Sequence, residues 1–231
     1  MSRLRLSLCL LVRNELPGCK ADVPRLPRDA FDEIYAVDGG STDGTVEFLE
    51  QHGIPVHRQP KKGLNAAYHH AVNVTRSDAV VVFFPKGTID PASLRTFRPL
   101  LEDGAGMVIA SRMIAGGRNE EDDKIVRPRK WGVLALALGA AVLWRREGHR
   151  VRDILHGVKG MTVEAFRAMR IQDHGVSIDL EMTARAYKLR IPRAEFPVRE
   201  NARFYGESNF KIIPTAKKLL SYIWFELRRK D

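Results

Sequence analysis

One glycine-rich turn constrains the fold of this chain more than any other stretch. Residues 36–45 read Ala-Val-Asp-Gly-Gly-Ser-Thr-Asp-Gly-Thr, with an apolar run before them at 34–37 and an amphipathic run after them at 46–51. This order predicts a strand, a tight turn and a helix, a junction whose outward backbone amides can hold a phosphate or a nucleotide. Asp38 and Asp43 are suited to accept hydrogen bonds from a base or a ribose. Asp-Gly pairs also mark ordinary turns, so the neighbouring segments decide the interpretation.

The neighbouring segments alternate between strand and helix patterns. Residues 4–12 alternate apolar and polar side chains, a short strand is expected around Val56, and residues 79–84 are typical of a buried strand. A helix is expected to open within residues 61–67. Strands separated by helices indicate an α/β fold with a mostly parallel central sheet, in which ligands bind at the carboxyl ends of the strands.

Six short motifs follow one another in an order known from one family. They lie at residues 12–15, 37–45, 63–67, 110–112, 157–160 and 203–208. The ordered set resembles the family 2 glycosyltransferases of GT-A fold and, within them, the dolichol-phosphate mannose synthase-like group of polyprenyl-phosphate glycosyltransferases. The resemblance implies a GT-A domain over residues 1–211, with a donor half over about 1–92 and an acceptor half over about 93–211. A basic amphipathic helix is expected over residues 212–231.

The resemblance also implies which residues form the site. The residues expected to bind the nucleotide-sugar are Val12, Asn14, Glu15, Asp38, Gly40, Lys62 and Asn65. The residues expected to bind the acceptor are Arg127, Arg129, Asp153, Lys159 and Ser208. Arg112 and Arg203 are expected to clamp phosphates, because a guanidinium offers a forked pair of donors. The loop 116–124 is expected to close over substrate, and its four acidic residues at 120–123 are expected to be solvated.

The chain departs from the family at the metal-binding Asp-x-Asp motif. Here it has Phe-Pro-Lys-Gly-Thr-Ile-Asp-Pro at residues 84–91, so two carboxylates are missing. In the family, that motif holds a divalent ion that stabilises the charge developing on the departing diphosphate. We expect Lys86 to place a positive charge near the same oxygens. Asp90 remains and is expected to be catalytic together with Lys86, Arg112 and Arg203, but one carboxylate is a poor site for a hard cation such as Mg²⁺ or Mn²⁺. No metal site and no cofactor are predicted; binding of Mg²⁺ or Mn²⁺ without the usual ligand motif is the alternative.

The charge balance points to an anionic partner. The chain has 38 Lys and Arg against 28 Asp and Glu, a formal net charge of +10. Nucleotide-sugars, acidic lipids and nucleic acids would all fit this charge, but no nucleic-acid recognition motif is present. The basic residues around 127–131 and 145–146 flank an apolar run, 133–144, with a tryptophan near each end. This pattern suits a helix at a membrane interface, and an ordinary core helix is the alternative.

The apolar stripe expected after Pro214 leaves the same choice open, because it suits a membrane surface, the catalytic domain, a second subunit or a membrane-protein partner. No run is long enough to span a bilayer, and the first residues lack a signal-peptide pattern. A cytoplasmic location, peripheral on the inner face of the cell membrane, is therefore expected. Cys9 and Cys19 are expected to be reduced thiols.

The family motifs that are absent favour one acceptor class. The Gln-x-x-Arg-Trp motif of members that glycosylate hydroxyls does not occur, and the chain's Glu-Asp pairs, at 102–103 and 121–122, lie outside the six family motifs. A lipid phosphate is already ionised at neutral pH and needs no catalytic base. The expected reaction is inverting displacement of a nucleoside diphosphate by a polyprenyl phosphate, possible without a divalent metal. A family 2 enzyme acting on a soluble or cell-surface glycan and a non-catalytic nucleotide-sugar-binding scaffold are the alternatives.

Overall fold

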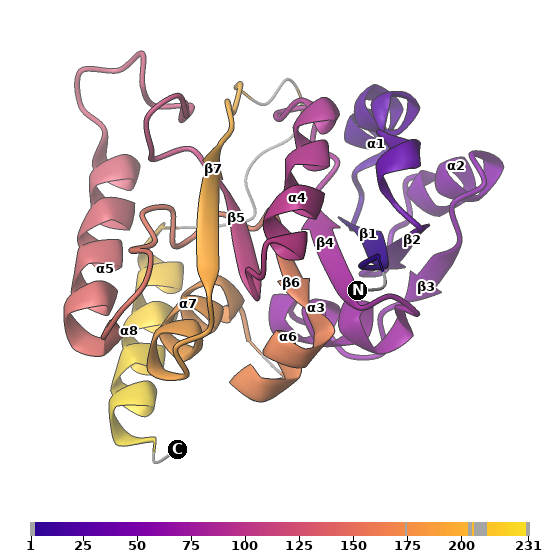
Figure 1. Ribbon diagram of the computed structural model, residues 1–231. Coiled ribbons are helices and arrows are strands. Elements are labelled where there is room, and N and C mark those ends of the chain that lie inside the picture. The colour runs from indigo at the N-terminus through magenta and orange to yellow at the C-terminus, as the bar shows by residue number, and fades with distance from the viewer. Residues whose placement is uncertain (1–2, 174, 203–204, 206–211, 230–231) are drawn as a thin grey trace.

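A seven-stranded sheet runs through the molecule in the order β3-β2-β1-β4-β6-β5-β7 (Figure 1). The computed structural model describes residues 3–173, 175–202, 205 and 212–229. The strands are β1 (Leu6–Val12), β2 (Glu33–Asp38), β3 (Val56–Arg58), β4 (Ala79–Phe83), β5 (Met107–Ser111), β6 (Lys159–Thr162) and β7 (Arg193–Pro197).

The sheet is mostly parallel, as the sequence predicts. Strand β1 pairs in parallel with β2 and β4, β2 with β3, and β5 with β7. Strand β6 is the exception, because it pairs antiparallel with both β4 and β5. Its sequence is short and contains Gly160, so the alternation that marks a strand is weak there. The predicted α/β fold class is confirmed.

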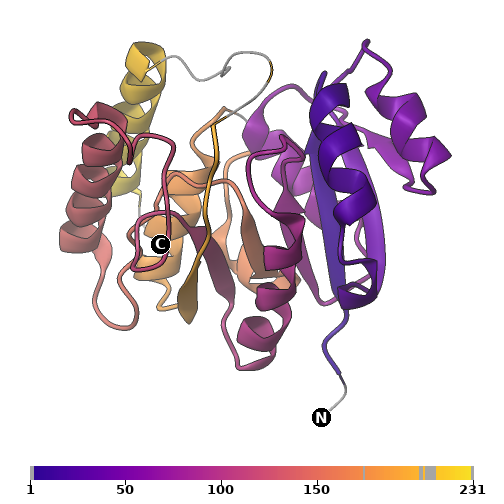
Figure 2. The ribbon, with the colours of Figure 1, turned by 90° about the horizontal axis from the view of Figure 1, so that it is seen from above.

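Helices cover both faces of the sheet (Figure 2). They are α1 (Leu16–Asp22), α2 (Thr45–Gln51), α3 (Leu64–Val74), α4 (Phe97–Glu102), α5 (Pro128–Trp144), α6 (Val163–Met169), α7 (Ile178–Lys188) and α8 (Ile212–Arg228). Short 3-10 turns lie at Val23–Arg25, Arg28–Ala30 and Pro91–Thr96. The core has two layers, because successive strand side chains point to opposite faces. Cys9 and Leu11 pack with α3, α6 and α7, whereas Leu8 and Leu10 pack with α1, α2 and α4.

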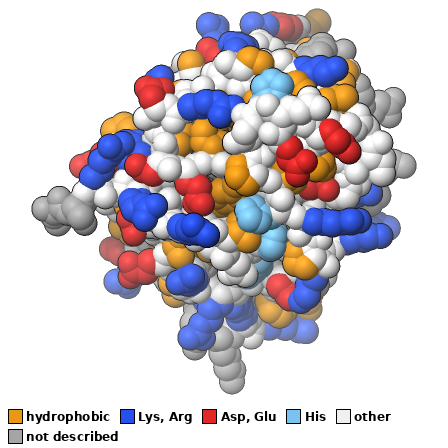
Figure 3. Space-filling model, turned by 90° about the vertical axis from the view of Figure 1, so that its right-hand side faces the viewer, with side chains coloured by type: hydrophobic (Ala, Val, Ile, Leu, Met, Phe, Trp, Pro, Cys, Tyr) orange, Lys and Arg blue, Asp and Glu red, His pale blue; other side chains and the backbone are white. Residues whose placement is uncertain are grey.

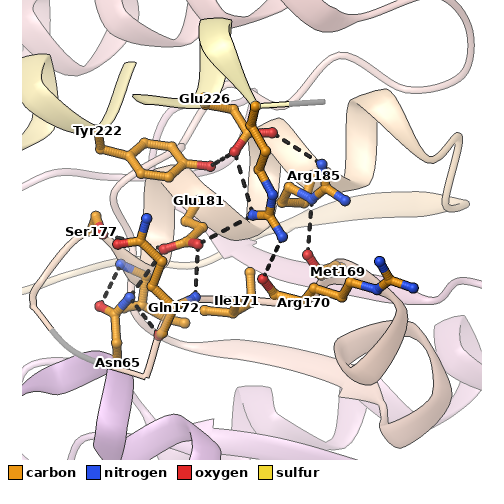
Figure 4. Close-up of polar contacts among 12 residues, drawn as sticks. Asn65, Met169, Arg170, Ile171, Gln172, Ser177, Glu181, Arg185, Tyr222 and Glu226 are labelled. Carbon is orange, nitrogen blue, oxygen red and sulfur yellow. Dashed lines mark hydrogen bonds and ion pairs between the residues drawn. The ribbon is translucent and has the colours of Figure 1, made fainter. Parts of the chain in front are cut away.

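A buried ionic cluster attaches α8 to the rest of the molecule (Figure 4). The carboxylate of Glu226, which is fully buried, accepts hydrogen bonds from Arg185 of α7 at 3.1 Å and from the Tyr222 hydroxyl at 2.9 Å. Arg229 lies 3.6 Å from Glu226 and 3.9 Å from Glu181, which carries the cluster into α7. Charges at this depth are tolerated only when they are paired, so the cluster fixes where α8 docks.

Helices α5 and α8 lie side by side at one end of the molecule (Figures 1 and 2). In α5, Ala137, Ala140, Ala141 and Trp144 are buried, so one face of the helix is core. Its other face exposes Trp131, Leu134, Leu138, Val142 and Leu143, and α8 exposes Leu220, Trp224, Phe225 and Leu227. The buried face fits the core-helix alternative for the 133–144 run, and the membrane-interface interpretation of the exposed face stays a prediction. Among the described residues, no helix combines the length and the apolar character that a membrane span requires.

Candidate active site

The turn after β2 is organised by its own aspartate. The Asp38 carboxylate accepts hydrogen bonds from the Gly40 amide at 2.9 Å, the Ser41 amide at 3.0 Å and the Ser41 hydroxyl at 2.6 Å. Gly40 has a φ of +94°, a conformation that favours glycine. Asp38 is only 4% exposed, so in this structure it shapes the turn. Its predicted contact with a nucleoside remains a prediction.

The loop after β1 is tied to the same turn. Val12 lies beside Asp38 in the sheet, and its carbonyl accepts the Gly39 amide at 2.9 Å. Asn14, with a φ of +53°, accepts the Thr42 amide at 2.8 Å through its side chain and donates its own amide to Ser41 at 2.9 Å. The carboxyl ends of two neighbouring strands thus form one rigid edge, as the parallel sheet predicts.

Tyr205 joins this edge from the far end of the chain. Its hydroxyl donates to the Glu15 carboxylate at 2.5 Å, and Glu15 is nearly buried. Tyr205 belongs to the motif at residues 203–208, and it is the one residue of that motif that the structure describes. Arg203 and Ser208, predicted as phosphate and acceptor ligands, lie outside the described residues. Sequence reasoning did not single out Tyr205, although the aromatic residue stands between the two predicted ligands.

The segment after β4 occupies the place of the missing metal motif. The Lys86 ammonium lies 4.9 Å from the centroid of the Phe84 ring, and that ring packs against Gly157. Asp90 instead forms an exposed ion pair with Arg25 at 2.7 Å and accepts the Ala92 amide at 3.2 Å. Its carboxylate caps a 3-10 turn, which accounts for the Asp-Pro sequence and gives it a structural partner where a catalytic role was predicted.

These residues do not fit a hard divalent ion. Such an ion needs several converging oxygen ligands, and the segment offers an ammonium and an apolar ring where the family has carboxylates. Within the part of the chain that the structure describes, no three carboxylate, imidazole or thiol side chains lie close enough together to hold a metal.

Arg112 is held in a buried ionic cluster. Its guanidinium donates to both carboxylate oxygens of Asp153, at 2.8 and 2.9 Å, and to Glu200 at 2.7 Å. Asp153 is fully buried. Burial alone would raise the pKa of Asp153, but the Arg112 guanidinium outweighs it and holds that pKa at about 2. The predicted roles of Arg112 as a phosphate clamp and of Asp153 as an acceptor ligand therefore require this cluster to open, which the motif pattern did not reveal.

His156 completes this cluster as a neutral group. Its Nδ1 atom contacts the Ala110 carbonyl oxygen, so Nδ1 carries the proton. Burial lowers the pKa of His156 to about 4, and the nearby Arg112 charge acts in the same direction. A histidine with this pKa is uncharged at neutral pH and serves here as a structural hydrogen-bond donor.

Two other predicted ligands are buried in contact with α7. Asn65 is fully buried; its amide donates to Glu181 at 3.1 Å and accepts the Ile178 amide at 3.0 Å (Figure 4). Lys159 on β6 is fully buried and forms an ion pair with Asp179. Both side chains tie α7 to the sheet and α3, so neither meets a ligand directly in this structure. Motif position alone does not distinguish such a core polar residue from a ligand.

The remaining predicted ligands are at the surface. Lys62 is exposed just before α3. Arg127 pairs with Asp122 at 3.3 Å, and Arg129 pairs with Glu120 at 3.0 Å.

The sequence predicted that the acidic run before α5, residues 120–123, is solvated, but Glu121 is buried. Glu121 is buried and accepts the Lys130 amide at 3.0 Å, so it caps the first turn of α5. The loop is thereby tied to the start of that helix.

Charge on the face over β3 is mixed rather than gathered. Figure 3 shows basic, acidic and histidine side chains interspersed on this side of the molecule. The histidines His57 and His70 lie together there, with ring centroids 6.3 Å apart. The described residues on this face therefore form no patch of a single charge sign.

Comparison with known proteins identifies the family. The pattern described as glycosyl transferase family 2 matches residues 13–172. The chain belongs to this family. It is 28% identical over 179 residues to the glycosyltransferase AglJ of Haloferax volcanii, which covers 77% of this chain and 57% of the relative. The chain thus spans little more than half the length of that curated relative.

Solved structures show the same fold. The glucosyl-3-phosphoglycerate synthase of Mycobacterium tuberculosis, in complex with uridine diphosphate, superposes with a TM-score of 0.69 at 17% identity, covering 99% of this chain and 82% of that one. The same enzyme with Mn²⁺, UDP-glucose and phosphoglyceric acid gives a TM-score of 0.69 at 16% identity, with 99% and 81% coverage. At this identity the likeness shows the GT-A fold.

The buried His156 predicts an acid-sensitive contribution to stability. In the unfolded chain a histidine titrates near pH 6.5, whereas His156 titrates at about 4 in the folded protein. Between these values the unfolded state binds the extra proton, so stability falls as pH drops from about 6.5 to 4, by about 3 kcal/mol.

Urea unfolding at several pH values should show this loss in the wild type, while His156→Asn should lack that component. A difference between the two proteins that does not change with pH would contradict the assignment of a neutral, buried imidazole.

Proposed function

We propose that the protein is an inverting glycosyltransferase that moves a sugar from a nucleotide-sugar to a polyprenyl phosphate without requiring a divalent metal. The observation that carries this proposal is Lys86, which follows β4 where related enzymes hold a metal ion with carboxylates. It lies in the segment that packs on α1, the helix that follows the loop after β1. The finer placement, in the dolichol-phosphate mannose synthase-like group, rests on the order of the motifs.

The chemistry asks this edge to hold a nucleoside diphosphate while negative charge builds on its leaving oxygen. An ammonium at Lys86 supplies one positive charge to that oxygen and needs no metal coordination. Asn14, Glu15 and Asp38 border the nucleoside position. Because an acceptor phosphate is ionised at neutral pH, its oxygen attacks the anomeric carbon, the bond to the diphosphate breaks, and no protein base has to take a proton.

The relatives support the proposal that the donor is a nucleotide-sugar, but they do not identify the acceptor. Structures of the Mycobacterium tuberculosis enzyme contain UDP or UDP-glucose, which favours a nucleotide-sugar donor here. Its acceptor in those structures is phosphoglyceric acid, which carries a phosphate but no lipid. A family 2 enzyme acting on a soluble or cell-surface glycan is therefore the second candidate. A non-catalytic nucleotide-sugar-binding scaffold is the third.

We also propose that a membrane surface is the partner of α5 and α8, consistent with a peripheral cytoplasmic enzyme. Trp131 is 56% exposed and Trp224 is 58% exposed, on helices that lie side by side. Arg145 and Arg228, at the ends of these helices, are also exposed. Exposed indoles next to basic residues suit the headgroup region of an anionic bilayer, where a lipid phosphate would be presented. A homodimer through the same face is the competing arrangement.

The donor proposal predicts metal-independent binding. UDP-, GDP- and dTDP-linked sugars should be tested by thermal unfolding, each with Mg²⁺, Mn²⁺ or EDTA. One nucleotide class at about a hundred times its Kd should raise the melting temperature by about 5 °C, equally in EDTA, because ligand that binds only the folded state stabilises it. The sugar 1-phosphate without a nucleoside serves as the control. Stabilisation that appears only with a metal would overturn the role given to Lys86.

The membrane proposal predicts binding to vesicles that depends on the exposed indoles. The wild type should cosediment with phosphatidylglycerol vesicles and much less with phosphatidylcholine vesicles. Trp131→Ser with Trp224→Ser should weaken binding at least about tenfold, because two indoles leave the interface. Leu189→Ser, which removes a partly exposed apolar residue at the end of α7, is the control. Unchanged sedimentation of the double variant, or a concentration-dependent dimer that it abolishes, would contradict the membrane assignment.

A further inference from the structure

Helix α1 packs its backbone directly against the segment that carries Lys86. At Gly18 an added Cβ atom would lie 2.1 Å from the Pro85 carbonyl oxygen and 2.8 Å from the Lys86 Cα atom. Contacts this short exclude every side chain, so glycine is required at position 18. The path of the chain through Pro85 and Lys86 is therefore set by α1.

One turn further along α1, Asp22 holds the residue after Lys86. Residues four apart lie on one face of a helix, so Asp22 follows Gly18 toward the same segment. Its Oδ2 atom accepts the Gly87 amide at 2.8 Å. Gly87 has a φ of +67°, a left-handed turn that this hydrogen bond closes against the helix.

Burial of the Asp22 side chain lowers the stability of the fold. The side chain is fully buried, and its Oδ1 atom has no hydrogen-bond partner among the residues that the structure describes. Burying such an oxygen without a partner is unfavourable. Burial also raises the pKa of Asp22 to about 6. A carboxyl oxygen accepts the Gly87 amide whether or not the group is ionised, so an asparagine can reproduce the hydrogen bond.

We infer that Asp22 is a positioning residue that fixes the Lys86 ammonium at the donor diphosphate by holding Gly87 against α1. This inference rests on the proposed role of Lys86. Asp22 acts through the backbone and does not touch the ligand. Without it, the backbone at Gly87 is no longer fixed, so the Lys86 side chain can point in other directions. The effect is confined to the diphosphate part of a donor, because the Asp38 turn and the Asn14 loop are held by other hydrogen bonds.

The test compares binding of nucleoside diphosphates and of the matching nucleosides by calorimetry in EDTA. UDP, GDP and dTDP are the probes. One of these diphosphates is expected to bind the wild type. Asp22→Ala and Lys86→Ala should each lower the affinity for that diphosphate about tenfold and leave the affinity for the matching nucleoside unchanged. The double variant should be no weaker than either single variant, because both changes remove the same contact. Asp22→Asn should retain wild-type affinity within about threefold.

A matched control loses a similar hydrogen bond at the opposite edge of the sheet. Asp32 accepts the Leu6 amide at 2.8 Å, at the start of β1, and Asp32→Ala should leave both affinities unchanged. If Asp22→Ala does not fold, as judged by its melting curve, Asp22→Ser replaces it, since the shorter side chain does not reach the Gly87 amide.

The outcomes that overturn the inference can be told apart. Equal weakening of diphosphate and nucleoside by the Asp22 variant, or full additivity with Lys86→Ala, would show a general structural role. If Lys86→Ala weakens the diphosphate while Asp22→Ala does not, only the positioning role fails. If Lys86→Ala has no effect on the diphosphate, the proposed role of Lys86 fails, and the positioning inference with it.

Discussion

The parallel pairing of β1 with β2 and β4 is the constraint on which the rest of the site depends. Because Val12 and Asp38 lie beside each other in the sheet, the two loops that follow them must share one edge. Hydrogen bonds from Asn14 and Asp38 then stiffen that edge. The segment after β4 reaches the same edge, so the place that carboxylates would occupy is fixed by sheet register. We propose that the lysine there offers its charge where the family has a metal ion.

The sequence predicted well which loops meet at the carboxyl ends of the strands, and it predicted the roles of their side chains less well. Strand positions, the start of helix α3 and the Asp38 turn follow from local patterns, which is why the fold class could be predicted. The partners of Asp153, Lys159 and Asn65 could not, because each is an ion pair or hydrogen bond to a segment distant along the chain. The residue type of a polar motif position is the same whether its side chain binds a ligand or forms a buried hydrogen bond in the core. Strand β6 was not predicted, because its four residues do not alternate between apolar and polar side chains.

Two charged groups therefore play different physical parts. The Arg112 cluster is buried, with Asp153 and Glu200 on one guanidinium, and it holds β5, the 153–156 segment and the chain after β7 together. Lys86 is partly exposed, at a segment that packs on helix α1. Removing a partner from the first is expected to cost stability, whereas changing the second alters the charge offered to a ligand. The site thus keeps its structural charges apart from the one proposed to act on the substrate.

The most direct measurement is release of nucleoside diphosphate from the stabilising nucleotide-sugar, with polyprenyl phosphate as acceptor and EDTA present. The account predicts turnover by the wild type in EDTA and a loss of about a hundredfold in Lys86→Ala, because one preorganised positive charge at the leaving oxygen is removed. Turnover that starts only when Mg²⁺ or Mn²⁺ is added would contradict it. Donor binding with no release under any condition would instead identify a non-catalytic scaffold.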